Sequence, residues 1–104
     1  MIYLITDEPT VASTPTAGKF PLGRIVATDG AIAAIPNEEL LNAISRHHHA
    51  DWGDLEEDDW YGNDRSLCNG SRLFSQYESK VGIKFWIITE HDRSVTTVLL
   101  PSEY

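Results

Sequence analysis

The sequence predicts an α+β fold in which an antiparallel sheet packs against two to three helices from the middle of the chain. The final third is dense in β-branched and aromatic residues over three segments, 73–77, 84–90 and 95–100, joined by short polar connections. The middle third carries apolar residues at helical spacing, and another apolar run, 2–6, begins the chain. A C-terminal three-stranded meander plus an N-terminal strand therefore accounts for the sheet.

With 104 residues the chain has the length of one domain, and we expect residues 1–104 to fold as one unit. Residues 7–18 are rich in Pro, Thr, Ser and Ala and lack an apolar period, so they are predicted to form a loop. A further strand is expected over 24–28, where a β-branched run ends at a turn-forming Asp-Gly pair.

Two helical segments should follow this strand. Asp29 is placed to cap a short turn over residues 31–35, and Pro36 begins a second helix that runs to about His48. The spacing i, i+3, i+4, i+7 predicts a buried stripe of Leu40, Leu41, Ile44 and His47.

A third helix is predicted before the meander. Asp54 is expected to be its N-cap, because Glu57 lies three residues on in the capping-box position. The pair Asn69 and Gly70 provides a suitable C-terminal stop.

The charge distribution restricts the partners of this chain. Sixteen acidic residues against eight basic ones give a net charge of −8, and residues 51–65 alone carry seven acids and one base. Binding to nucleic acid or to an anionic membrane depends on Lys and Arg, so we expect no direct nucleic-acid contact and no membrane contact. A basic protein surface is the expected partner.

The compartment follows from cysteine use and from the first residues. The single cysteine, Cys68, cannot form an intrachain disulfide, and we expect it to be a half-buried structural residue. Residues 1–8 lack a basic region followed by a long apolar run, and no stretch approaches the length of a membrane span. We therefore expect a cytoplasmic protein.

The acidic segment, residues 51–64, is the main candidate site because it interleaves carboxylates with aromatic residues. Charge combined with aromatic anchors is typical of a surface that binds a basic partner. A solvated helix face with its aromatic rings turned into the core has the same composition. The predicted partner-binding residues are Asp51, Trp52, Asp54, Glu56, Glu57, Asp58, Asp59, Trp60, Tyr61 and Asp64.

A metal site centred on His47, Asp51 and Asp54 is the first alternative, with His91 or Asp92 as a further ligand. Imidazole and carboxylate groups are common ligands of transition metals. However, the three consecutive histidines that begin at His47 point about 100° apart on a helix, so at most one can share a face with Asp51. A His47 packed in the core is the simpler interpretation.

Signatures of catalysis are weak, and we expect neither an enzyme nor a bound cofactor. The carboxylate pairs Asp51 with Asp54 and Glu56 with Asp92 have no feature that would separate their pKa values. Cys68 has no basic neighbour in the sequence to activate it. The sequence contains no Gly-rich phosphate loop, serine elbow or paired-cysteine motif.

The chain from Phe20 to Tyr104, about four fifths of its length, resembles a family of small proteins carried by plasmids, phages and integrative elements. The matching motifs are FPLGRIVAT (20–28), DWGDL (51–55), GSRL (70–73), WIITE with DRS (86–90 and 92–94) and TTVLLPSEY (96–104). Members of that family usually carry a single histidine at the position of His47 and glycine at that of Ala50. The resemblance implies a mobile-element setting and no particular catalytic residue.

Three functional hypotheses follow. The first is an anti-defence protein of the anti-CRISPR or anti-restriction type, which inhibits a nucleic-acid-binding complex, with residues 51–64 acting as a DNA mimic. The second is the metal-dependent enzyme or metal-binding protein described above. The third is a homo-oligomeric regulatory module joined through an unpaired edge strand such as 95–100.

Overall fold

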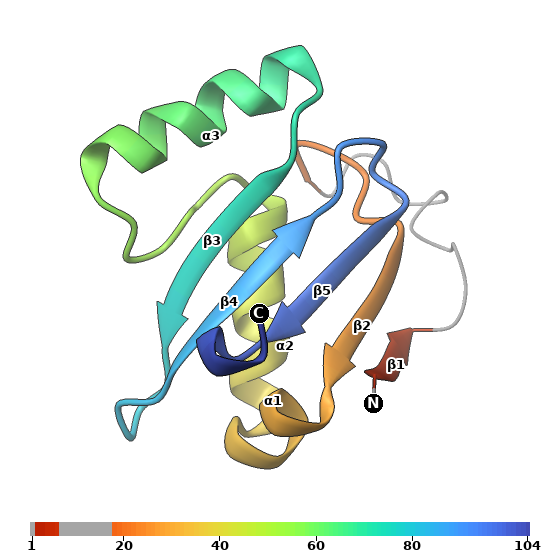
Figure 1. Ribbon diagram of the computed structural model, residues 1–104, viewed down its shortest axis with the longest axis vertical. Helices are drawn as coiled ribbons and strands as arrows, with labels where there is room; N and C mark the ends of the chain where they lie inside the picture. Colours follow the sequence, from red (N-terminus) through yellow and green to blue (C-terminus); the bar gives the residue numbers. More distant parts are fainter. Residues whose placement is uncertain (1, 7–17) are drawn as a thin grey trace.

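The computed structural model describes residues 2–6 and 18–104, and it confirms the predicted α+β fold. A five-stranded sheet has the strand order β1-β2-β5-β4-β3 (Figure 1). Its strands are β1 (Ile2–Thr6), β2 (Arg24–Thr28), β3 (Leu73–Glu78), β4 (Lys84–Thr89) and β5 (Val95–Leu99). The helices are α1 (Asp29–Ala34), α2 (Asn37–His48), α3 (Glu57–Asn69) and the short 3-10 helix η3 (Pro101–Glu103). Apart from Gly18, the predicted loop over 7–18 lies outside the described residues.

The predicted C-terminal meander is present, but the sheet is mixed because one strand pair is parallel. β3 pairs antiparallel with β4, β4 with β5, and β1 with β2, whereas β2 pairs parallel with β5. The helices between β2 and β3 return the chain to the end of the sheet at which β2 began. Two hairpin reversals then give β5 the direction of both β3 and β2.

The position of β5 corrects the prediction that residues 95–100 form an unpaired edge. β5 lies between β2 and β4, so both sides of its backbone are paired, and it cannot join two copies by strand addition.

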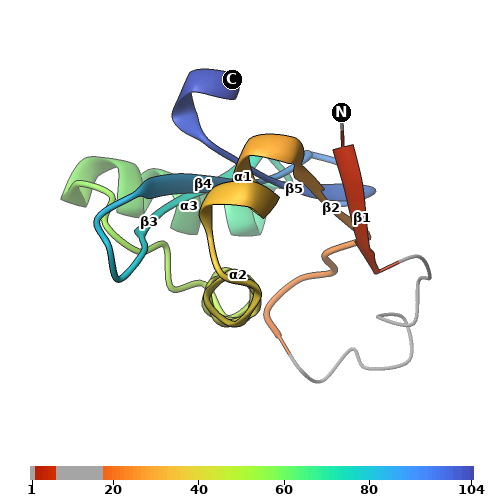
Figure 2. The same ribbon diagram turned by 90° about the horizontal axis from the view of Figure 1, so that it is seen from below.

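Helix α2 covers one face of the sheet, as the view along the sheet shows (Figure 2). Its buried residues are Leu40, Ala43, Ile44 and His47, which pack against sheet residues that include Ile25, Leu73, Phe85, Ile87 and Val98. Leu41 was predicted to be buried but is 49% exposed. The four buried positions span about 100° of the helix surface, and Leu41 lies about 60° outside that arc, so it faces solvent while the smaller Ala43 takes an inner position.

The C-terminal turn η3 lies on the opposite face of the sheet (Figure 2). The Glu103 carboxylate holds it there by accepting hydrogen bonds from Thr28 Oγ1 at 2.5 Å and from the Gly30 N–H at 3.1 Å. Tyr104 then contacts Trp86 of β4 edge to face, with ring centroids 5.6 Å apart.

Helix boundaries correct two predicted caps. Thr28, not Asp29, caps α1 through its side chain, and Asp29 is the first helical residue. Helix α3 begins at Glu57 with Glu56 at the N-cap position, because the Asp54 N–H bonds to the Gln76 carbonyl and holds the preceding loop along β3.

Helix α3 ends as the sequence predicts. Gly70 adopts the left-handed conformation, with φ of 80°, and its N–H bonds to the Ser66 carbonyl. Within the residues described, no helix is both long enough and apolar enough to cross a membrane.

Candidate partner-binding site

The acidic segment leaves the end of α2, follows the edge of β3 and then enters α3 (Figure 1). Gly53 forms a parallel bridge with Gln76 of β3, and the Gln76 N–H donates to the Trp52 carbonyl at 3.2 Å. Gly53 has φ of +76°, and a Cβ atom there would lie 2.0 Å from the Gln76 carbonyl oxygen. Glycine at this position is therefore required for the close approach to β3.

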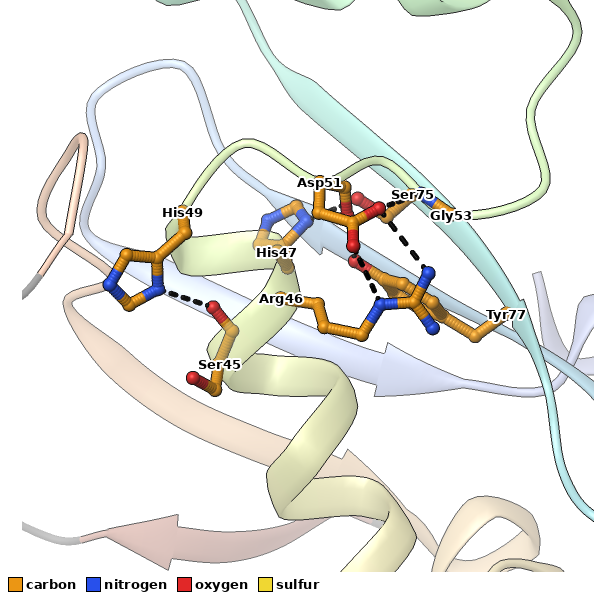
Figure 3. A network of polar contacts seen from close by, with 8 residues as sticks. All are labelled: Ser45, Arg46, His47, His49, Asp51, Gly53, Ser75 and Tyr77. Carbon is orange, nitrogen blue, oxygen red and sulfur yellow. Dashed lines mark hydrogen bonds and ion pairs between the residues drawn. The ribbon is translucent and has the colours of Figure 1, made fainter.

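Asp51 interacts within the chain. Its carboxylate accepts a hydrogen bond from Arg46 Nε at 2.8 Å and one from the Gly53 N–H at 3.1 Å (Figure 3). The hydrogen bond from Arg46 lowers the pKa of the Asp51 carboxyl below its usual value. The Tyr77 hydroxyl donates to the Asp51 backbone carbonyl at 2.6 Å. Asp51 thus anchors the loop to α2 and β3.

Trp52 is a core residue, which corrects its prediction as a partner anchor. It has no exposed surface and stacks against Phe20, with ring centroids 6.2 Å apart. Its indole Nε1 donates to the Asp64 carboxylate at 3.0 Å. The bond ties the start of the acidic segment to α3, and it engages one oxygen of Asp64.

The other acidic residues of the segment project into solvent. We call Asp54, Glu56, Glu57, Asp58 and Asp59 the acidic cluster; all five are exposed. In the described part of the chain none of them makes an ion pair, whereas Arg46 pairs with Asp51 and Arg72 with Glu90. Three of the five occupy the first turn of α3, where a carboxylate interacts favourably with the helix dipole.

The predicted aromatic anchors differ in exposure. Trp60 is half-buried and packs against the core, while Tyr61 is 54% exposed. A surface hollow of about 420 Å³ adjoins the acidic cluster and is lined by Leu55, Glu57, Trp60, Tyr61 and Asp64. Carboxylates beside aromatic rings suit the side chain of a lysine or an arginine.

Two residues outside the predicted partner-binding set fix α3 in place. Asn63 bonds through its side-chain amide to the backbone of Phe74 in β3. Arg93, in the β4–β5 turn, donates to the carbonyls of Ser66 at 3.1 Å and Ser71 at 2.6 Å. Arg93 has a positive φ of 60°, and neither residue carries a local sequence signal for this role.

The structure does not bring the predicted metal ligands together. His47 has no exposed surface, and its ring nitrogens contact Ser75 Oγ at 2.5 Å and Thr89 Oγ1 at 2.9 Å. Asp92 instead accepts bonds from Ser94. Among the described residues, no three His, Cys, Asp or Glu side chains form a group that could hold a metal ion.

The remaining histidines, among them the exposed His91, and Cys68 lie outside any such arrangement. His48 is half-buried, and His49 is exposed with Nδ1 2.7 Å from the Ser45 carbonyl (Figure 3). Cys68 is exposed near the end of α3, so the prediction of a half-buried cysteine is wrong. Helix α3 packs along a strand edge and not across a face, and among its residues only Asn63 is fully buried.

No protein-family model, no curated protein and no solved structure matches this chain. The resemblance to small mobile-element proteins therefore stays a prediction from the motifs given above.

Proposed function

We propose that this chain is an inhibitor that binds a basic surface of a nucleic-acid-binding host defence complex, such as a CRISPR effector or a restriction enzyme. The acidic cluster is the contact surface, and the protein competes with nucleic acid for the same Lys and Arg residues. In this function the chain is not an enzyme and contacts no nucleic acid itself.

One observation carries this proposal: five carboxylates are exposed together beside the sheet and make no ion pair within the described part of the chain. Asp51 and Asp64 belong to the same segment but serve the fold, through Arg46 and Trp52. The like charges of the other carboxylates repel one another, and a basic partner would relieve that repulsion.

The neighbouring hollow supports the same function. Tyr61 and the carboxylates of Glu57 and Asp64 border a concavity beside the acidic cluster. A lysine or arginine that normally contacts phosphate can enter such a hollow with its alkyl stem against the rings and its charge beside the carboxylates. That lysine or arginine could then no longer contact the phosphate of a nucleic acid, so the defence complex would be inhibited.

The test is inhibition of DNA binding and cleavage by a panel of purified CRISPR effectors and restriction enzymes, at low and high salt. We expect at least one complex to be inhibited at low salt and released at high salt, because exposed charges are screened. Reversal of Glu56, Glu57, Asp58 and Asp59 to Lys should weaken that inhibition about tenfold or more.

The matched comparison is between two single reversals of exposed carboxylates, Glu57→Lys in the first turn of α3 and the control Glu38→Lys in the first turn of α2. The control has the same kind of dipole penalty but lies outside the acidic cluster. Thermal unfolding of the variants checks that each still folds. Unchanged inhibition by a folded variant with the acidic cluster reversed, or equal loss in Glu57→Lys and Glu38→Lys, would contradict the proposal.

A further inference from the structure

A second concave site lies on the sheet face opposite α2, next to the C-terminal turn. The hollow has a volume of about 300 Å³ and is lined by Arg72, Phe74, Trp86, Ile88 and Tyr104. Phe74 and Trp86 stand on adjacent strands with ring centroids 4.9 Å apart, and Tyr104 contacts Trp86 with ring centroids 5.6 Å apart. Three aromatic rings from β3, β4 and the C-terminal turn therefore converge on one hollow.

Apart from Arg72, the walls of this hollow are mainly apolar. The Trp86 indole N–H donates to Gln76 at 3.0 Å, which satisfies the polar edge of that ring. Ile88 is 4% exposed and contributes only hydrocarbon. A ligand in the hollow would therefore meet ring faces, ring edges and aliphatic carbon over most of its surface.

Arg72 is the one charged residue that lines the hollow. Its side chain is 47% exposed, and its guanidinium lies 5.6 Å from the centre of the Tyr104 ring. Its ion pair with Glu90 is long, with Nε 3.7 Å from the Glu90 carboxylate. In the part of the chain described here, no hydrogen bond uses the terminal nitrogens of Arg72, so a planar fork of donors is available to an anion at the rim.

From this arrangement we propose that the hollow binds a small aromatic anion, a single or fused ring that carries a carboxylate. The ring would lie among Phe74, Trp86 and Tyr104, and the carboxylate would face Arg72. The volume suits a ligand of about one or two rings. This site is independent of the function proposed for the acidic cluster.

The backbone around the hollow disfavours the addition of a peptide strand. A bound peptide strand needs free backbone donors and acceptors at a sheet edge. β3 is bonded to β4 on one side, and on the other side to Asn63 and to the loop at Gly53. A compact ligand needs none of these groups.

The experiment is a ¹H–¹⁵N NMR titration of the full chain with 2-naphthoate and, separately, with its neutral analogue 2-naphthamide. The indole N–H of Trp86 is the reporter, and that of buried Trp52 is the internal reference. We expect 2-naphthoate to shift the Trp86 signal saturably and to leave the Trp52 signal unmoved. The amide should bind about tenfold more weakly, because it lacks the charge that Arg72 recognises.

Two surface variants separate a local contact from general attraction. Arg72→Gln should weaken 2-naphthoate binding about tenfold and leave 2-naphthamide binding unchanged. Lys84→Gln removes a charge from the same sheet face, two residues before Trp86 and outside the hollow. It should change neither affinity.

Three results would overturn the inference. The first is no Trp86 shift at millimolar ligand. The second is equal affinity for 2-naphthoate and 2-naphthamide, or an equal effect of Arg72→Gln and Lys84→Gln on 2-naphthoate binding. Either result would show that the hollow does not recognise an anion through Arg72. The third is broadening of the Trp86 signal that grows with protein concentration alone, which would show that a second copy of the chain covers the hollow.

Discussion

The side-chain amide of Asn63 in α3 hydrogen-bonds both backbone groups of Phe74 in β3, as a neighbouring strand would. Its Nδ2 donates to the Phe74 carbonyl, and its Oδ1 accepts from the Phe74 N–H at 3.1 Å. Two residues further along β3, Gln76 is bridged by Gly53. Together these contacts occupy backbone groups that would otherwise leave this sheet edge open to association.

Asn63→Ala should therefore destabilise the fold. Both backbone groups of Phe74 lose a partner, so we expect the free energy of unfolding to fall by about 2 kcal/mol or more. Asn63→Asp should be comparably harmful, because a carboxylate oxygen would face the Phe74 carbonyl. Urea denaturation gives the values, with Asn42→Ala, at an exposed position of α2, as the control. Equal stability of the variants at 63 and 42 would contradict the proposed role of Asn63.

The proton on His47 should reside on Nε2. Thr96 Oγ1 donates its only proton to the Leu22 carbonyl, so the 2.8 Å contact with Thr89 must use the proton of Thr89. Thr89 then has to accept from His47 Nε2, and Ser75 must donate to Nδ1. Long-range ¹H–¹⁵N spectra distinguish the two tautomers, and a protonated Nδ1 in the neutral ring would refute this order of donors.

The same histidine should make the fold sensitive to mild acid. Burial lowers the pKa of His47 from 6.5 to about 3. Between these values the unfolded chain takes up a proton that the folded chain does not, so stability falls as the pH falls below 6.5. The loss should be about 1.4 kcal/mol of unfolding free energy per pH unit.

Urea denaturation at pH 7 and pH 5 measures this loss. The pKa of His48 is also lowered by burial, so His48→Gln is the control, and it should retain most of the pH dependence. The pKa values of Asp51 and Glu103 are lowered too, chiefly by hydrogen bonds from Arg46 and Thr28. Their contributions are lost only near and below their usual carboxyl pKa values, mostly at lower pH. If the pH dependence disappears in His48→Gln, then His48 and not His47 causes it.

Gly53 and Gly70 form a matched pair that separates backbone strain from steric clash. Both have a positive φ, but a Cβ at Gly53 would meet the Gln76 carbonyl at 2.0 Å, whereas nothing lies within 4 Å at Gly70. Gly70→Ala should cost about 1 kcal/mol of unfolding free energy from the left-handed conformation alone. Gly53→Ala should cost clearly more, because the loop must also move away from β3. Equal losses in thermal or urea unfolding would show that the loop adapts freely.

The local sequence determined much of the secondary structure. β-branched and aromatic density located β3, β4 and β5, Gly70 ended α3, and the helical period placed Leu40, Ile44 and His47 on the inner face of α2. The concentration of charge in residues 51–65 likewise follows from composition alone. These features depend on residues close together in the chain.

Only the tertiary structure decided how these elements meet. The pairing of β2 with β5 joins segments about 70 residues apart, so no local pattern could show that it is parallel or that β5 is central. Trp52 and Tyr61 have similar surroundings in the sequence, yet Trp52 is enclosed by Phe20 and bonded to Asp64, while Tyr61 faces solvent. The aromatic hollow likewise combines β3, β4 and the C-terminal turn, because packing brings together side chains that the sequence separates.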